Sequence, residues 1–362
     1  MRGIKTISDA LAQPEDNFLL LRFIAASMVI YGHASAISGG YAPTDIFVVL
    51  GWGEYSGSIA LDLFFITSGF LVTGSFCRRQ NVVHFVWARF IRIMPAFMTC
   101  LLLCALLIGP IFSIHALGSY LSDPETAGYV TANLRLGPYL SWDLPGVFLG
   151  NPKRTTINGS IWTLPAEIRM YVWVAILGLI GVLRVRWIFN TALAGLFILG
   201  FLAPAYLPLV PVDAYVRLAA LFALGGFCYI NRSWIPIHGA LVVAMIVTTY
   251  LFRSTASYLC LFSVCEVLFV FWFAYNTPWR GFNRYGDYSY GIYLWGYPMQ
   301  QMLAALFPLL PALINALLGF LGALAAAVGS WHFIEKPALG LKNVPIRLDA
   351  FVRNRIALAR AR

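Results

Sequence analysis

The stretch LLLRFIAASMVIYGHASAI (Leu19 to Ile37) is apolar and long enough to cross a bilayer, yet it carries two ionisable side chains, Arg22 and His33. Eleven positions separate the two residues, which at about 100° per residue is close to three full turns of helix. Both side chains therefore lie on one helix face, separated by roughly 16 Å along the axis. One face of a predicted membrane helix presents a cation near one end and an acid/base group nearer the other.

The composition of the chain determines its class. Hydrophobic residues make up 60% and charged residues 11%, and the mean hydropathy is +0.76. These values exclude an ordinary soluble domain and predict an all-α polytopic membrane protein. Because a span needs about 20 mainly apolar residues, about ten transmembrane helices are predicted, with nine or eleven left open. They cover residues 18–38, 58–76, 93–112, 159–183, 187–207, 215–230, 237–252, 257–275, 287–307 and 311–333.

The net charge of +10 is distributed unevenly along the chain. With ten spans, most Lys and Arg residues fall in segments on the same side as both termini. This asymmetry is the positive-inside rule, so both termini are predicted to be cytoplasmic, and membrane lipid rather than nucleic acid is the expected partner. Residues 1–340 are predicted to form one transmembrane domain, and residues 341–362 a basic cytoplasmic tail that lies against the anionic inner leaflet. The six cysteines have no metal-ligand pattern, so no metal is predicted.

The cytoplasmic mouth of the predicted bundle is cationic. Arg22 lies about four residues inside its span, and the segment WARFIRIMP places Arg89 and Arg92 at (i, i+3) on one helix face. Pro95 is expected to bend or start that span. Such an arginine cluster suits phosphate groups. The alternative is that the three arginines only anchor their helices by reaching the lipid headgroups.

The outer half of the bundle is predicted to hold an acid/base cluster. His33, Asp62 in LDLFFITSGF and Glu167 in GSIWTLPAEIRMY are expected at similar depth, within a turn or two of the outer surface. A neutral histidine can accept a proton from a hydroxyl, and a carboxylate can orient the ring and stabilise its charged form. Ser68 and Gly69 follow below Asp62, where a glycine allows another backbone or a ligand to approach closely.

Each of these outer residues also has a structural alternative. His33 is equally consistent with a polar contact between helices, and Asp62 with a helix cap or an ion pair. Glu167 is close in sequence to Arg169. Glu266 and Arg217 are also charged residues within predicted spans, where charge is costly, and the sequence assigns them no role.

Six segments together make the chain resemble a known family. They are LRFIAASMVIYGHA, LDLFFITSGFLVTGSF, FVWARFIRIMPAF, GSIWTLPAEI, YGDYSYGIYLWGYPMQ and FIEKP, in this order along most of the chain. The chain resembles the acyltransferase type 3 family of bacterial inner-membrane proteins, which O-acylate carbohydrates. The resemblance implies a multi-pass protein of the bacterial inner (cytoplasmic) membrane that takes acyl groups from cytoplasmic acyl-CoA, most often acetyl-CoA, and adds them to sugar hydroxyls on the periplasmic side.

The resemblance also implies roles for individual residues. His33 matches the proposed catalytic base, and Glu167 and Asp62 match acidic positions of the family's motifs. The remaining matches are on the donor side, namely Arg22, Arg89, Arg92, Ser68 and Gly69. In the late motif, which commonly reads Tyr-Leu-x-His-x-Pro, this chain has Gly296 in place of the histidine. About thirty residues follow the last predicted span, too few for the soluble domain that many relatives carry.

The sequence therefore predicts acyl transfer, with acyl-CoA phosphates held by the arginines and the thioester reaching His33. The distance from Arg22 to His33 is close to the length of an extended pantetheine arm. Acetyl is the expected group, and a larger group such as succinyl is left open. The expected acceptor is a carbohydrate such as O-antigen or exopolysaccharide. The segment 113–158 offers aromatic residues that could stack on a sugar and acidic residues that could hydrogen-bond to it. They are Tyr120, Tyr129, Tyr139, Trp142, Asp123, Glu125 and Asp143.

Two other functions remain open from the sequence. A secondary transporter or flippase for an anionic substrate also uses intramembrane Arg, His and carboxylates, although no internal repeat supports it. A non-catalytic assembly subunit would explain Gly296. Whether the protein forms an oligomer or works with a glycan-export partner is likewise left open.

Overall fold

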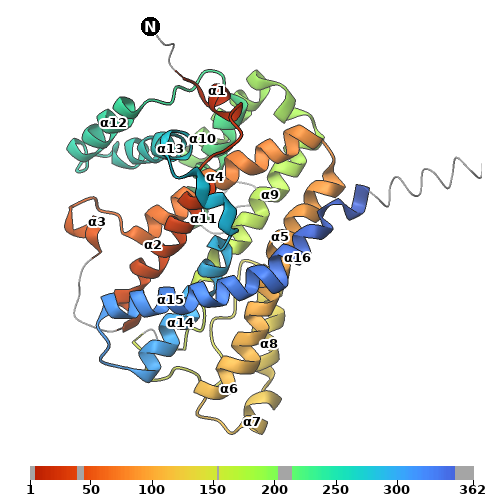
Figure 1. The fold of residues 1–362 in the computed structure, drawn as a ribbon, viewed down its shortest axis with the longest axis vertical. Helices are drawn as coiled ribbons and strands as arrows, with labels where there is room; N and C mark the ends of the chain where they lie inside the picture. The colour runs from red at the N-terminus through yellow and green to blue at the C-terminus, as the bar shows by residue number, and fades with distance from the viewer. Residues whose placement is uncertain (1–4, 39–44, 153–154, 203–213, 347–362) are drawn as a thin grey trace, which may run out of the picture.

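The computed structural model describes residues 5–38, 45–152, 155–202 and 214–346 of the chain (Figure 1). Within these ranges every regular element is helical, apart from three isolated β-bridges, which confirms the predicted all-α class. The longer helices are α2 (Phe18–Ser38), α4 (Ser56–Arg79), α5 (Val82–Leu103), α8 (Pro124–Leu134), α9 (Leu164–Leu179), α10 (Arg186–Leu202), α11 (Ala214–Ile230), α12 (Gly239–Leu251), α13 (Tyr258–Asn276), α14 (Ser289–Leu306) and α15 (Ala312–Ser330). The short ones include α1 (Ile7–Leu11), α3 (Ile46–Val49), α6 (Gly109–Phe112), α7 (Leu117–Ser122), α16 (Lys336–Gly340), the π-helical turns η1 (Cys104–Ile108) and η6 (Trp331–Glu335), and the 3₁₀ turns η2 (Gly159–Thr163), η3 (Val182–Arg184), η5 (Arg280–Tyr285) and η7 (Leu341–Asn343).

Each predicted span overlaps one of the longer helices. Among the described residues, five helical segments are long and apolar enough to cross a membrane, namely Phe18–Ser38, Ser56–Arg79, Val82–Phe112, Tyr258–Asn276 and Ala312–Ile346. Shorter apolar helices occur at Arg186–Leu199, Ala214–Ile230 and Gly239–Leu251. The chain is therefore a multi-pass, all-helical membrane protein. The end of the predicted span 187–207 and most of the predicted tail, residues 347–362, lie outside the described residues.

The third predicted span begins earlier than the sequence indicated. The helix starts at Val82, where Asn81 caps it by accepting the His84 N–H (2.8 Å), and runs through Pro95 into η1 and α6. Pro95 lacks the N–H that would bond to the Ile91 carbonyl, a gap that membrane helices tolerate. The helix continues past it, and Thr99 Oγ1 donates to the Pro95 carbonyl (2.9 Å). The uninterrupted segment of 31 residues is about 46 Å long. Arg89 and Arg92 therefore project from within a helix.

Helix α4 lies at the centre of the bundle and packs closely on α11. A Cβ added at Gly69 would lie 1.9 Å from the Phe222 carbonyl oxygen, and one added at Gly225 would lie 2.1 Å from the Ile66 carbonyl oxygen. Only glycine permits such an approach of two backbones, which is the usual mode of close helix packing in membranes. The structure thus confirms that Gly69 admits another backbone, that of α11.

The register between α2 and α4 fixes the depth of the candidate site residues. The two helices pack together, and a Cβ at Gly32 would lie 2.7 Å from the Gly57 amide nitrogen. Ser56 Oγ donates to the Met28 carbonyl (3.2 Å). His33, next to Gly32, is therefore level with the start of α4.

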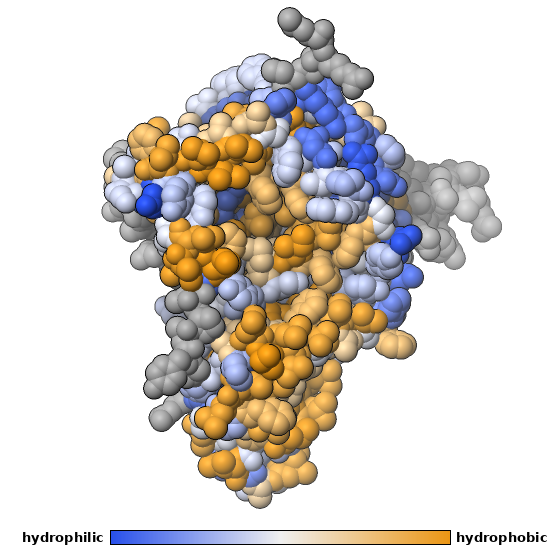
Figure 2. Space-filling view, turned by 60° about the vertical axis from the view of Figure 1, so that its left-hand side comes forward, coloured by the Kyte–Doolittle hydropathy of each residue, from blue (hydrophilic) through white to orange (hydrophobic). Residues whose placement is uncertain are grey.

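The segment between α6 and η2 forms a projection at one end of the molecule, where α6, α7 and α8 lie together in Figure 1. Hydrophobic residues cover this projection in Figure 2, and hydrophilic ones gather mainly towards the opposite end. Tyr120 and Tyr129 are fully buried in it, and the Tyr120 hydroxyl donates to the Ala105 carbonyl (2.7 Å). The prediction that these two tyrosines stack on sugar is wrong, because they pack α7 and α8 onto α5 and η1. Tyr139, 88% exposed, remains accessible.

Candidate active site

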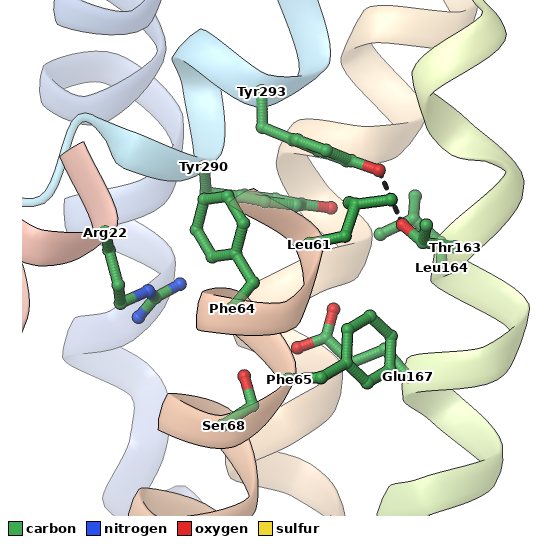
Figure 3. Close-up of a pocket in the computed structure, with 10 residues that line it drawn as sticks. All are labelled: Arg22, Leu61, Phe64, Phe65, Ser68, Thr163, Leu164, Glu167, Tyr290 and Tyr293. Atoms are coloured by element: carbon green, nitrogen blue, oxygen red, sulfur yellow. Dashed lines mark hydrogen bonds between the residues drawn. The ribbon is translucent and has the colours of Figure 1, made fainter. Parts of the chain in front are cut away.

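A small cavity of about 40 Å³ lies among α2, α4, α9 and α14 (Figure 3). Arg22, Ser68 and Glu167 come from three different helices and point towards this common space in Figure 3. The structure therefore brings together three of the residues that the sequence singled out. The complete lining is Arg22, Leu61, Phe64, Phe65, Ser68, Thr163, Leu164, Glu167, Tyr290 and Tyr293.

Two of the three predicted phosphate-binding arginines are held by carboxylates. Asp287 Oδ2 forms ion pairs with Arg22 (3.6 Å) and with Arg92. Glu335 Oε2 pairs with Arg92 (3.4 Å), and its other oxygen accepts a hydrogen bond from Ser330 (2.9 Å). Two guanidinium groups are thus matched by two carboxylates, which satisfies the rule that buried charges are paired. The sequence analysis overlooked Asp287 and Glu335, although both lie in the motifs YGDYSYG and FIEKP.

Arg89 differs from Arg22 and Arg92 because it forms no ion pair within the described part of the chain. Its guanidinium lies over the ring of Tyr171 (5.7 Å), and the hydroxyl of Tyr171 donates to Glu167 Oε1. The Nε atoms of Arg89 and of Arg22 are buried and have no hydrogen-bond partner. Unpaired buried donors of this kind suit an anionic or carbonyl oxygen of a ligand.

Glu167 lies deeper than the sequence predicted. Gly159 lies at the level of His33, because both contact Tyr297: a Cβ at Gly159 would lie 2.6 Å from the ring of Tyr297. The intervening residues Gly159–Thr163 form a 3₁₀ helix, which rises about 2.0 Å per residue and is therefore longer than an α-helix of equal residue number. Glu167 consequently lines the cavity together with Arg22, about three helical turns along α2 from His33.

His33 packs against a row of tyrosines on α14. Its ring meets the ring of Tyr297 edge to face, with 5.3 Å between centroids and an interplanar angle of 75°. Tyr290, Tyr293 and Tyr297 stand at i, i+3 and i+7, so they share one face of α14. The first two line the cavity, and the Tyr293 hydroxyl lies 2.5 Å from Thr163 Oγ1. This row, which we call the tyrosine ladder, connects the cavity with His33.

Asp62 belongs to a second buried cluster, which faces α11 and α13. Its carboxylate forms an ion pair with Arg217, whose other terminal nitrogen pairs with Glu54 (2.7 Å). The carboxyl group of Glu266 interacts with that of Asp62. Asp62 therefore pairs with a cation, which was the structural alternative for this residue. Arg217 and Glu266, to which the sequence assigned no role, both lie beside Asp62.

Two glycines beside the site face helices. Gly69 packs on α11, so it supports the wall of the cavity next to Ser68, whereas Ser68 itself lines the cavity. A Cβ at Gly296 would lie 2.6 Å from Ile30 of α2. Ile30 thus occupies the space that a histidine at position 296 would need, which is the local consequence of the departure from the family's motif.

These groups can act by hydrogen bonding and by general acid–base catalysis. In the described part of the chain, no group of three or more His, Cys, Asp or Glu side chains could hold a metal ion. The cavity offers the guanidinium of Arg22, the hydroxyl of Ser68 and the carboxylate of Glu167. A proton acceptor, His33, lies at the far end of the tyrosine ladder. Such an arrangement can bind an acidic ligand at one level and move a proton at another.

Comparison with known proteins agrees with this chemistry. The profile of a family described as an acyltransferase domain matches residues 16–333. The chain is 25% identical to an "O-acetyl transferase" of Shigella phage Sf6 over 348 residues, which cover 91% of this chain and 97% of the relative. It is also 25% identical to "Nodulation protein 10" of Rhizobium leguminosarum bv. viciae over 369 residues, which cover 91% and 94% of the two chains. None of the solved structures matches the chain.

Proposed function

The chain belongs to the acyltransferase type 3 family, and we propose that it is a membrane O-acyltransferase. It moves an acyl group from cytoplasmic acyl-CoA to a hydroxyl of an extracytoplasmic glycan such as O-antigen or exopolysaccharide. It works in the bacterial inner membrane with about ten spans and both termini cytoplasmic, an orientation favoured by the positive-inside distribution of Lys and Arg. The name of the phage relative, "O-acetyl transferase", supports transfer to oxygen.

One observation carries this proposal: the tyrosine ladder lines the Arg22–His33 face of α2, from the cavity beside Arg22 to His33. Arg22 and Arg89 have buried Nε donors without partners at the inner level. His33 is about 16 Å further out along α2. An acyl-CoA that enters from the cytoplasm with its pyrophosphate beside Arg22 and Arg89 can extend its pantetheine arm along the ladder and present the thioester to His33.

The reaction needs one proton acceptor and no net change in protonation. His33 takes the proton of the acceptor hydroxyl while the oxygen attacks the thioester carbonyl carbon. The C–S bond then breaks, and the proton passes from His33 to the departing thiolate of CoA. The ester remains on the glycan. Transfer through an acylated protein group is the alternative route.

The other predicted site residues support this step from different positions. Glu167 and Ser68 line the cavity through which the donor passes, where Glu167 orients Tyr171 beneath Arg89. Asp287 and Glu335 hold and neutralise Arg92 at the mouth, so Arg92 is less available to the donor than Arg89. Asp62 acts through Arg217 by fixing α4 against α11, and Gly69 permits that packing. Acetyl is the proposed acyl group, which the name of the phage relative supports.

The test uses purified protein in lipid nanodiscs with labelled acetyl-CoA and a pool of export glycans. We expect CoA release that depends on the glycan, with the label recovered on the glycan. His33→Gln, which keeps a polar side chain, is expected to lower kcat by about 10²–10⁴-fold. His238→Gln, at the cap of α12, serves as the matched control and should retain activity. Uptake of an anionic solute into vesicles without CoA release would support the transporter instead.

A further inference from the structure

Several arginines and lysines lie near the predicted cytoplasmic surface. Arg22 and Arg92 are neutralised by carboxylates within 4.0 Å. Among the residues that the structure describes, Arg79, Arg89 and Lys342 have no such ion pair. A set of cations without carboxylates repels itself unless an anion binds between them. Arg78, Arg284 and Lys336 also lack an ion pair in the described part of the chain, but Arg79, Arg89 and Lys342 share a position near one residue, His84.

Arg79 and Lys342 gather around one buried histidine. The guanidinium of Arg79 lies 2.6 Å from His84 Nε2 and also donates to Asn343 Oδ1 (3.3 Å). His84 is only 6% exposed, and Arg79, Lys342 and Arg89 all lie close enough to act on its charge. A guanidinium only donates, so His84 accepts at Nε2 as a neutral ring. His84 and Asn343 thus orient Arg79, which is exposed at the surface.

The fold holds this cluster at the corner where α4 meets α5. Helix α4 ends at Arg79, and Gln80 adopts a left-handed conformation (φ 50°) that reverses the chain into α5. The C-terminal turn η7 is tied to the same corner, because the Trp87 indole donates to the Leu341 carbonyl (2.9 Å). Residues more than 250 positions apart are thereby fixed side by side. The arrangement is a built feature of the fold, and both Arg79 and Lys342 are exposed at its surface.

The position of this corner relative to Arg89 suggests the ligand. Arg89 lies five residues beyond His84 on α5, which is about 7.5 Å along the axis. An anion held at Arg79 and Lys342 is thus one sugar-sized step on the cytoplasmic side of an anion held at Arg89. Coenzyme A carries its phosphates in this way, with the pyrophosphate on the 5′ side of the ribose and a single phosphate on the 3′ side.

We propose that Arg79 and Lys342, with Arg79 oriented by His84 and Asn343, bind the 3′-phosphate of the acyl-CoA donor. This inference rests on the proposed function in so far as it names coenzyme A. The shared chemistry is a phosphate monoester, and the other source of phosphate at this surface is a lipid headgroup. A phosphate monoester is bound by charge-assisted hydrogen bonds from both cations, which a donor without the 3′-phosphate cannot form.

The kinetic test compares acetyl-CoA with acetyl-3′-dephospho-CoA in nanodiscs made only from zwitterionic lipid. Wild type should prefer acetyl-CoA, and Lys342→Gln should reduce that preference in kcat/KM by about tenfold, the effect of one lost charge-assisted contact. Arg79→Gln should reduce it further. The control is Arg186→Gln, a surface arginine that donates to Ser233 and stacks on Trp234; it should leave the ratio of the two donors unchanged. A ratio that is equal in wild type and Lys342→Gln overturns the proposal.

A binding measurement separates this inference from the proposed function. Adenosine 3′,5′-bisphosphate and ADP are titrated separately into the same nanodiscs. Wild type should bind the bisphosphate more tightly, and Lys342→Gln should lose the difference. Retained discrimination in a protein that transfers no acyl group would keep this site and remove the O-acyltransferase proposal. Acyl transfer by a protein that binds the bisphosphate and ADP equally would keep the O-acyltransferase proposal and overturn the 3′-phosphate site. Discrimination that disappears when anionic lipid is added would assign the cluster to lipid headgroups and overturn the proposal.

Discussion

Replacing Arg217 by Gln is expected to destabilise the protein by about 2–3 kcal/mol. Arg217 is the cation that pairs with both Glu54 and Asp62, and the Asp62 side chain is 1% exposed. Glu266, with 6% exposure, adds a further carboxyl group whose oxygens have no hydrogen-bond donor. Breaking a fully buried ion pair costs about 3–5 kcal/mol. We reduce this value because 34% of the Arg217 side chain is exposed and solvent screens part of the interaction.

The reasoning is tested by compensation. Asp62→Asn removes the charge that Arg217 neutralises, so the Arg217→Gln/Asp62→Asn double variant should be more stable than the sum of the two single losses predicts, by at least about 1 kcal/mol. Unfolding of all four proteins is followed by tryptophan fluorescence in identical micelles. Strictly additive losses would refute the view that Asp62 acts through Arg217.

The same double variant also separates structure from catalysis at Asp62. If the carboxylate only fixes α4 against α11, the folded double variant should keep kcat within about threefold of wild type. A loss of about 100-fold in kcat, at wild-type stability and KM, would instead return Asp62 to a direct role beside His33.

Three further substitutions test the packing, the donor mouth and the histidine. Gly225→Leu should prevent recovery of monodisperse protein, because its Cβ would lie 2.1 Å from the carbonyl of Ile66, whereas Gly195→Leu, with nothing within 4 Å, should be tolerated. Arg89→Gln should raise KM for acetyl-CoA by about 10–100-fold and change kcat less, measured as initial rates of CoA release. Tyr297→Leu should lower kcat by about tenfold at unchanged KM, and Tyr297→Phe should retain activity, because the ring edge makes the contact with the histidine.

Each of these expectations has a clear opposite. Normal yield of Gly225→Leu would mean that α4 and α11 are not in backbone contact. An unchanged KM in Arg89→Gln would remove this arginine from the donor site. Equal losses in both Tyr297 variants would show that the hydroxyl, rather than ring packing, is what matters there.

The helical spans could be predicted from the sequence because they depend on local composition. A run of apolar residues such as 311–333 must be buried or face lipid wherever its neighbours lie, and its backbone is satisfied only as a helix. The start of α5 was missed because Pro95 resembles a helix boundary, whereas the helix continues through it. Close packing of Gly69 on Phe222 follows only from the tertiary arrangement, although the glycine itself indicated a close approach.

The sequence named several residues that the structure places around the cavity, but it did not predict how they are arranged. Arg22 and Glu167 were both identified, yet they meet at one level because η2 takes Glu167 about three helical turns away from the level of His33. Asp287 could not be assigned to Arg92 from spacing, since 195 positions separate them. Ion pairs between distant helices depend on the fold, and the short motifs around Asp287 and Glu335 were the only local signal.

Transfer across the membrane is the central claim, and sided proteoliposomes test it most directly. The protein is reconstituted, and the vesicles are sorted by the side on which an added C-terminal tag is accessible. Labelled acetyl-CoA is supplied on one side only, with the glycan acceptor on the other. The account predicts labelled glycan when acetyl-CoA is on the side of the C-terminus and none in the reverse arrangement. Labelling only when donor and acceptor are on the same side would contradict it.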